Sequence, residues 1–149
     1  MPSSRITLVL ASIEDSDILF NWVNDPLTRR WSVNTDPVTR EQHDHWLSAT
    51  LNNRNRDLYI AMQDGTPVGT VRADFSNGTY ELSWTVSPAV RGRGVGKCMV
   101  AMMADQLKGD VTARIKAGNT TSVRIAEHAG LKFDHEADGI WFFRRTIAL

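Results

Sequence analysis

The sequence lacks the residues on which disulfide-rich and zinc-binding proteins depend. Only one of its 149 residues is cysteine, Cys98, which excludes an intrachain disulfide framework and a zinc site built from several cysteines. Its four histidines show no spacing with carboxylates that resembles a zinc motif, so we expect no metal. A lone cysteine also fits a reducing compartment, and we expect a cytoplasmic protein.

The sequence also lacks an excess of charge and a long apolar run. Its 17 basic residues balance 17 acidic ones, without the surplus that nonspecific binding to nucleic acid or to an anionic membrane requires. The first apolar run, Ile6 to Ala11, is too short for the core of a signal peptide or for a membrane span. We therefore expect neither nucleic acid nor a membrane as a partner. The oligomeric state stays open, a homodimer included.

No repeat, low-complexity stretch or shift in composition divides the chain, which predicts one domain over residues 1–149. The predicted order is β-α-α-β-β-β-α-β-α-β-β. Strands are expected at 5–11, 58–62, 68–75, 79–87 and 111–115 and in the tail at 131–133 and 140–147, and helices at 14–23, from 39 onward, at 95–107 and at 119–129. The fold class is α/β (α+β), with a central, mixed, mostly antiparallel sheet and about four helices.

Local signals support this order. Thr39 with Gln42 three residues later forms a capping box, which predicts the start of the second helix. Asp64-Gly65 and Asn77-Gly78 are typical of tight hairpins and predict a three-stranded meander. The helix after residue 95, which we expect to end at Gly109, has one apolar stripe formed by Val95, Cys98, Met99, Met102, Met103 and Leu107.

A glycine-rich loop, Arg91-Gly92-Arg93-Gly94-Val95-Gly96, stands between a predicted strand and a predicted helix. Glycine lets backbone approach a ligand closely, and the start of a helix presents unpaired N–H groups, so the loop suits a phosphate cradle with two arginines beside it. The alternative is a flexible turn with no ligand. Alternating Arg and Gly at a helix start favours the anion site.

Two familiar phosphate motifs do not fit this loop. A P-loop needs four residues between its first glycine and the Gly-Lys pair, followed by Ser or Thr. Here only three residues lie between Gly92 and Gly96-Lys97, and Cys98 follows. A dinucleotide fingerprint beginning at Gly92 would need glycine where Lys97 stands. A pyrophosphate held by a six-residue turn remains.

The loop resembles a known family. Arg91-x-x-Gly94-x-Gly96 matches the Q/R-x-x-G-x-G/A signature with which the GNAT superfamily of N-acetyltransferases holds the pyrophosphate of coenzyme A. The preceding segment 81–88 is similar to the family's fourth strand, and Asn119-x-x-Ser122 with Gly130-Leu131-x-Phe133 is similar to its last helix and the turn after it. The resemblance covers nearly the whole chain and implies an enzyme that uses acetyl-CoA.

The resemblance implies roles for particular residues. The backbone from Arg91 to Lys97 (Arg91, Gly92, Arg93, Gly94, Val95, Gly96 and Lys97) would bind the pyrophosphate, and the N–H of Val86 would donate to the thioester carbonyl and stabilise the oxyanion. Asn119 and Ser122 would contact the pantetheine or the adenosine end of coenzyme A. An N-cap of the last helix is an equally good explanation of Asn119.

The N-terminal half resembles GNAT enzymes that acetylate nucleotide-linked amino sugars, such as those of the pseudaminic acid pathway. The similarity rests on Asn24-Asp25-Pro26, on His43-x-x-Trp46 and on a stretch between them. It implies an acceptor site that includes Arg29, Arg30, Trp31, Asn34, His43 and Trp46, although solvated arginines and a half-buried tryptophan explain the same letters. The arginine expected before Asn24 is Val23 here, which puts the nucleotide in doubt.

The catalytic expectations are a base and a missing acid. Glu81, ten residues before Arg91, stands where carboxylate bases occur in GNAT enzymes, although a solvated strand position explains it too. His43 is the next candidate. The tyrosine that serves as acid in much of the superfamily would stand at Ala126, and the only tyrosines are Tyr59 and Tyr80.

The expected activity is transfer of acetyl from acetyl-CoA to a primary amine of a small polar acceptor. Two alternatives stay open: an N-acetyltransferase acting on protein N-termini or side chains, and a noncatalytic domain that senses acyl-CoA. Glu81, Ser83, Arg29 and His43 supply polar groups on the acceptor side and argue against the second alternative.

Overall fold

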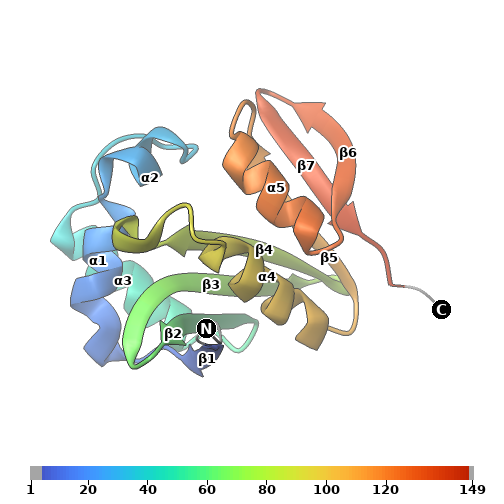
Figure 1. The fold of residues 1–149 in the computed structure, drawn as a ribbon. Coiled ribbons are helices and arrows are strands. Elements are labelled where there is room, and N and C mark those ends of the chain that lie inside the picture. Colours follow the sequence, from blue (N-terminus) through green and yellow to red (C-terminus); the bar gives the residue numbers. More distant parts are fainter. Residues whose placement is uncertain (1–4, 148–149) are drawn as a thin grey trace.

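A computed structural model describes residues 5–147, in which seven strands form one sheet (Figure 1). The order across the sheet is β1-β2-β3-β4-β5-β7-β6. Every neighbouring pair is antiparallel except β4 and β5, which run parallel. This confirms the predicted mixed, mostly antiparallel sheet. The strands are β1 (Ile6–Leu10), β2 (Arg56–Gln63), β3 (Thr66–Ser76), β4 (Thr79–Val86), β5 (Asp110–Lys116), β6 (Lys132–Ala137) and β7 (Ile140–Arg145).

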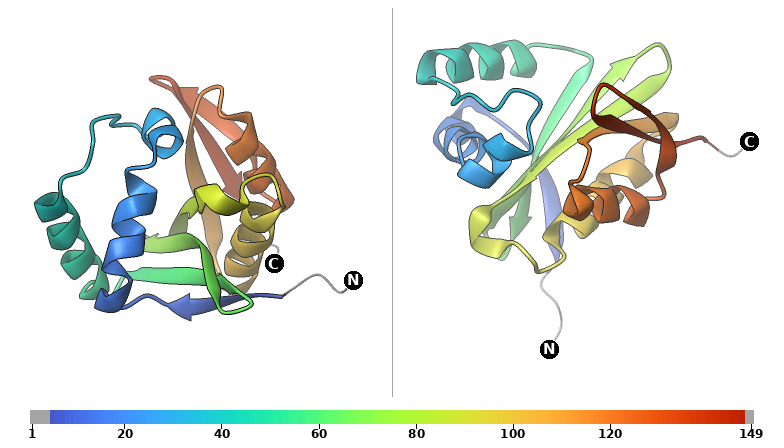
Figure 2. Two further views of the ribbon diagram at one scale, coloured as in Figure 1. Left: turned by 60° about the vertical axis from the view of Figure 1, so that its left-hand side comes forward. Right: turned by 90° about the horizontal axis from the view of Figure 1, so that it is seen from above.

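Five α-helices and two short 3-10 turns accompany the sheet: α1 (Ser16–Val23), α2 (Pro26–Arg30), α3 (Arg40–Leu51), α4 (Val95–Gln106), α5 (Thr120–His128), and turns at Ile13–Asp15 and Pro88–Val90. Helices α1 and α3 lie on one side of the sheet, and α4 and α5 lie on the other (Figure 2). The sequence predicted about four helices and missed α2. Asp25 at its N-cap and Pro26 at its first position were the available signal.

Strand alternation sorts the core into two clusters, one on each face of the sheet. Leu58 and Ile60 of β2 pack with Leu19, Trp22 and Leu47 of α1 and α3. The next residue, Ala61, turns to the other face and joins a larger cluster under α4 and α5. Strand β4 directs its odd-numbered residues to the α1 and α3 face.

Helix α4 differs from its predicted stripe. Cys98 is exposed, whereas Val100 and Ala104 are buried, and the helix ends at Gln106, three residues before Gly109. Helix α4 carries apolar residues around most of its circumference, so the spacing of these residues alone did not decide which face of the helix is buried.

The predicted hairpins are confirmed and a third is added. All four residues of Asp64-Gly65 and Asn77-Gly78 have positive φ, as a tight hairpin turn requires. Asp138-Gly139 makes the same kind of turn between β6 and β7. Strand β6 extends well past the predicted segment 131–133. It is an edge strand whose residues are all exposed, and an edge strand needs no alternating apolar pattern.

The two parallel strands separate halfway along their length. Their pairing ends at Leu82 and Ala113, although β4 continues to Val86 and β5 to Lys116. Past that point each strand presents backbone groups that the other does not satisfy, and the glycine-rich loop follows directly after β4. This split is the candidate site.

No helix within residues 5–147 is long and apolar enough to cross a lipid bilayer.

Candidate active site

The backbone of the glycine-rich loop is open and rich in donors. Gly92 and Gly94 have φ of +79° and +78°, and a Cβ built on either would meet no atom within 4 Å. Gly94 is the N-cap of α4 and provides no side-chain cap, so the N–H groups of Val95, Gly96 and Lys97 have no acceptor in their own helix. Free N–H groups at the positive end of a helix dipole, beside unfilled space, fit an anion such as a pyrophosphate.

Gly96 has a different role from the other two glycines. A Cβ there would lie 2.6 Å from Cδ1 of Ile125 and 3.1 Å from Cγ2 of Val86. Glycine at this position lets α4 pack closely against α5 and β4. Gly96 thus fixes where the loop lies against β4 and α5, whereas Gly92 and Gly94 allow the backbone conformation of the loop.

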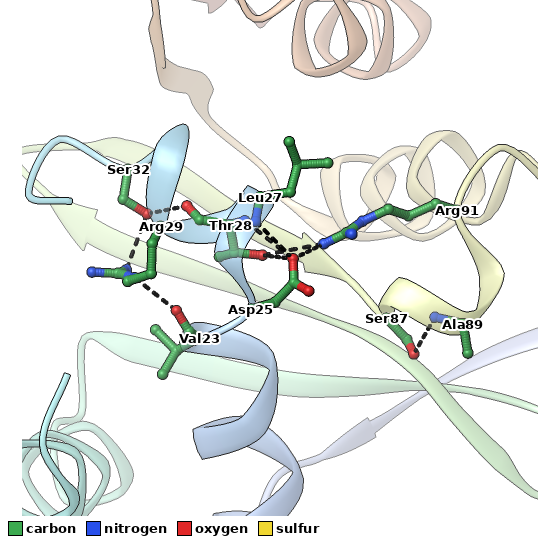
Figure 3. A network of polar contacts seen from close by, with 9 residues as sticks. All are labelled: Val23, Asp25, Leu27, Thr28, Arg29, Ser32, Ser87, Ala89 and Arg91. Carbon is green, nitrogen blue, oxygen red and sulfur yellow. Dashed lines mark hydrogen bonds and ion pairs between the residues drawn. The ribbon is translucent and has the colours of Figure 1, made fainter. Parts of the chain in front are cut away.

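The side chain of Arg91 points away from the loop. Its guanidinium pairs with the carboxylate of Asp25, which also accepts hydrogen bonds from the N–H groups of Leu27 and Thr28 at the start of α2 (Figure 3). Partial burial would raise the pKa of Asp25, but the hydrogen bonds from Arg91 and Thr28 outweigh it and hold the pKa below its usual value. This link between the loop and α2 was missed, because sequence alone gives no pairing across 66 residues.

The N–H of Val86 is directed toward the split between β4 and β5. The next residue, Ser87, donates its N–H to the carbonyl of Val68 on the β3 side at 2.9 Å. Since successive residues of an antiparallel strand point their N–H groups to opposite sides, the N–H of Val86 points away from β3. The ladder with β5 has already ended at Leu82, so β5 takes up no hydrogen bond there.

Glu81 lies on β4 just before the split, on the face that turns toward α1 and α3. One of its carboxylate oxygens, Oε2, accepts a hydrogen bond from Nη2 of Arg114 on β5 at 3.0 Å, and the side chain is 31% exposed. Within residues 5–147 the other oxygen has no partner. The carboxylate is therefore fixed at one end and free at the other.

The predicted acceptor residues Arg29 and Asn34 are occupied within the connection between α1 and α3, residues 24–39. Arg29 donates to the carbonyls of Val23, Asn34 and Asp36 at 2.7, 2.9 and 3.0 Å, and also to Oγ of Ser32. The side chain of Asn34 accepts the N–H of Asp36 at 2.9 Å. These contacts hold the connection together and use four of the five N–H donors of Arg29.

The same connection explains the Asn-Asp-Pro pattern structurally. The amide of Asn24 donates to the carbonyl of Val38 and accepts its N–H, both at 2.8 Å, which closes the connection at its base. Asp25 caps α2 and Pro26 occupies its first position. The similarity seen in this stretch therefore reflects the local fold as much as the acceptor.

His43, predicted as a candidate base and as part of the acceptor site, lies in the interior. It is 2% exposed, its Nε2 lies 3.1 Å from the carbonyl of Ser16, and its ring packs between Phe20 and Trp46. Burial lowers the pKa of His43. The ring therefore packs in the interior, and a catalytic or acceptor-binding role for His43 stays a prediction.

The structure places Arg30 and Trp31 beside the split, while Trp46 lies elsewhere. Arg30 is exposed, and its guanidinium lies 5.6 Å from the ring centroid of Trp31. Trp31 lies next to Gly118, and Nζ of Lys116 at the end of β5 donates to the carbonyl of Arg30 at 3.0 Å. Half-buried Trp46 packs on the core of α1 and α3.

Asn119 is the N-cap of α5, as one of its two explanations predicted. Its Oδ1 accepts the N–H of Ser122 at 3.2 Å, and its Nδ2 donates to Oγ of Ser122 at 3.1 Å. Ala126, four residues after Ser122, is fully buried, and the half-buried Tyr59 and Tyr80 pack against the core cluster under α4 and α5.

Among residues 5–147 no three His, Cys, Asp or Glu side chains gather in a way that could hold a metal ion.

Comparison with known proteins agrees with this geometry. Residues 5–132 match the family model described as acetyltransferase (GNAT) domain. An aminoglycoside N(6')-acetyltransferase type 1 of Klebsiella pneumoniae is 22% identical over 87% of this chain and 75% of its own length.

Solved structures share the fold. A domain from Methanocaldococcus jannaschii superimposes with a TM-score of 0.86 at 22% identity, over 97% of this chain and 99% of that one. A spermidine N-acetyltransferase from Vibrio cholerae, in complex with CoA and spermine, superimposes with a TM-score of 0.82 at 12% identity, over 95% of both chains. The chain belongs to the acetyltransferase (GNAT) domain family and is an N-acetyltransferase that takes its acetyl group from acetyl-CoA.

Proposed function

We propose that the chain acetylates a primary amine of a small polar acceptor by direct attack within a ternary complex. The observation that carries the proposal is the arrangement at the split. Strand β4 carries both the backbone N–H of Val86 and the carboxylate of Glu81, which has one oxygen without a hydrogen-bond partner. The loop 91–97, with its unpaired N–H groups, follows that strand. One short segment thereby supplies an anion site, an oxyanion donor and a base.

The proposed chemistry needs two groups of the chain. Acetyl-CoA supplies the acetyl group as a thioester. The free oxygen of Glu81 takes a proton from the ammonium or attacking amine, directly or through a water, so that the nitrogen lone pair can form the new C–N bond. The N–H of Val86 stabilises the negative charge that develops on the carbonyl oxygen, a contribution of about 3 kcal/mol for one such donor. The C–S bond breaks and coenzyme A departs as a thiolate.

A tyrosine acid is not needed for this step. A thiol with a pKa near 8.5 leaves as thiolate without full protonation, whereas an ammonium must lose a proton before it can attack. The burial of Ala126 and the core positions of Tyr59 and Tyr80 are consistent with a mechanism that relies on the base.

The finer proposal concerns the acceptor, for which we favour a nucleotide-linked amino sugar. Arg30 offers a free guanidinium, and Trp31 beside it offers a face for a base or a sugar. Both lie next to the split, because Lys116 ties their backbone to the end of β5. An amine of modest basicity also suits a single carboxylate base better than lysine does, since lysine is about a thousandth neutral at pH 7.5.

Initial-velocity measurements with both substrates varied test the proposal. A uridine-diphosphate-linked amino sugar, the free amino sugar, and peptides with a free N-terminus or an internal lysine are compared as acceptors by release of coenzyme A. We expect intersecting reciprocal plots and turnover of the amino sugars. Parallel plots would point to an acetylated enzyme instead of direct attack. Robust acetylation of internal lysines, with no turnover of the linked sugar, would overturn the acceptor assignment.

A further inference from the structure

Arg114 presents a guanidinium at the split with most of its N–H donors free. Its only hydrogen bond within residues 5–147 runs from Nη2 to Oε2 of Glu81, and its side chain is 56% exposed. Arginine carries five N–H donors in a planar fork that matches a carboxylate or a phosphate with two parallel bonds. One end-on contact leaves most of that fork free.

The neighbouring cations on the same face are already engaged. Arg72 holds Asp74 with both Nε and Nη2, at 2.9 and 3.0 Å. Arg144 donates to Asp110 at 2.7 Å, and Lys116 is held by backbone carbonyls at the end of α2. Arg114 therefore differs from Arg72 and Lys116 in having most of its donors free. It is also more exposed than Arg144, which makes one hydrogen bond as well, at 56% against 40% of the side chain.

The strands carry more positive than negative charge on this face. Alternation along β2, β3, β4, β5 and β7 places five cations and three carboxylates on the side away from α4 and α5. They are Arg56, Arg72, Arg114, Lys116 and Arg144, with Asp74, Glu81 and Asp110. The chain is neutral overall, so this surplus on the strands is local.

We propose that the acceptor carries an anionic group, a carboxylate or a phosphate, close to its amine, and that the fork of Arg114 binds it. This inference rests on the proposed function, since it places the amine at the free oxygen of Glu81. The contact between Arg114 and Glu81 puts the anion site and the base next to each other, so one small molecule can reach both.

The same arrangement disfavours polycationic acceptors. A second or third ammonium would meet Arg114 and the surplus of cations, and like charges brought together reduce binding of the wrong substrate. The acceptor class would thus differ from spermine, which is bound in the Vibrio cholerae structure. Repulsion of additional ammonium groups and binding of an anion by Arg114 both favour an anionic acceptor.

Paired acceptors that differ only in their anion test the inference. The pairs are a uridine-diphosphate-linked amino sugar with its free sugar, and alanine with alaninamide, and spermine and kanamycin serve as polycations. Comparing the two pairs tells a phosphate from a carboxylate. The variants are Arg114→Gln, Arg114→Lys, which keeps the charge without the fork, and Arg54→Gln on an exposed loop as the control.

Arg114→Gln should raise KM for the anionic member of the preferred pair about tenfold or more, because a hydrogen bond to a charged group is lost. It should change kcat/KM for the uncharged member of the pair less than about threefold. A purely structural role of Arg114 would not produce this difference between the two acceptors. Arg114→Lys should lie between, and Arg54→Gln should match the wild type. Equal losses on both members of a pair, or a wild-type preference for spermine or kanamycin, would refute the anion site.

A binding measurement separates this inference from the proposed function. With the protein saturated by coenzyme A, inorganic pyrophosphate and alanine are titrated calorimetrically into wild type and Arg114→Gln. We expect binding that the substitution weakens about tenfold or more. Absence of binding, or binding that the substitution leaves unchanged, overturns the inference whatever the enzyme does. Failure to acetylate any amine while this binding is seen contradicts the proposed function alone.

Discussion

Gly94→Asp compared with Gly65→Asp gives a matched test of the coenzyme loop. The two glycines have almost the same φ, +78° and +76°, and a Cβ on either meets no protein atom within 4 Å. Each substitution therefore adds the same carboxylate in the same left-handed conformation, at a similar cost of roughly 1 to 2 kcal/mol in the free energy of unfolding. The variants differ in what lies beside them. Gly94 faces the open N-terminus of α4, and Gly65 lies in the hairpin between β2 and β3.

The expected signal is large enough to measure by thermal unfolding. Acetyl-CoA at a hundredfold excess over its dissociation constant adds about 2.7 kcal/mol to the stability of the folded state. For a chain of this length, 1 kcal/mol raises Tm by about 2 to 4 °C, so wild type should gain roughly 5 to 10 °C. Gly65→Asp should lose a few degrees without ligand and keep this gain. Gly94→Asp should show a similar initial loss and no gain.

The reason is electrostatic and steric together. An aspartate at residue 94 places a negative charge where the pyrophosphate would meet the N–H groups of residues 95–97, and it fills the space that the missing Cβ leaves. Differential scanning fluorimetry with a titration of acetyl-CoA gives both quantities in one experiment. If both variants shifted alike, the coenzyme would lie elsewhere and the assignment of the loop would be wrong.

Three further substitutions test separate parts of the account. Glu81→Gln should lower kcat/KM about a hundredfold or more at neutral pH and recover partly at alkaline pH, where more of the amine is neutral; an unchanged pH–rate profile would exclude Glu81 as the base. Because burial lowers the pKa of His43, the stability that this residue contributes should be complete above about pH 6.5 and fall as the pH drops below it. His43→Gln should flatten that fall in chemical unfolding between pH 6.5 and 5, and the exposed His45→Gln should not. Asp25→Ala removes the cap of α2 and the partner of Arg91 and should cost about 1 to 2 kcal/mol in urea unfolding, whereas Asp25→Asn, which can still cap, should cost less; equal costs would exclude the cap as the main contribution.

The elements that the sequence predicted correctly are those whose signals are local. The capping box of Thr39 and Gln42, the two Gly-containing hairpins and the alternation along β5 each depend on residues within a few positions of one another, and each is found in the structure. The family resemblance extended this to the whole fold. Helix α2 was missed because it is only five residues long and has no apolar stripe. The length of β6 was underestimated because an edge strand needs no alternating apolar pattern.

The site could be predicted only where backbone supplies the chemistry. Gly92 and Gly94 have the positive φ that glycine adopts readily, and the binding of coenzyme A by this loop stays a prediction. The acceptor side depends on contacts between distant segments that no local pattern encodes. Arg29 uses four of its donors within the connection 24–39, His43 is buried, and Arg114 reaches Glu81 because β5 pairs with β4.

Transfer of a labelled acetyl group tests the central claim most directly. The purified protein is incubated with acetyl-CoA carrying a ¹³C-labelled acetyl group and with a set of anionic, neutral and cationic amines, and the products are followed by mass spectrometry. The account predicts one N-acetylated acceptor for each coenzyme A released, with the label on nitrogen, and loss of both products in Gly94→Asp. Release of coenzyme A without any acetylated amine, or label that accumulates on the protein itself, would contradict it.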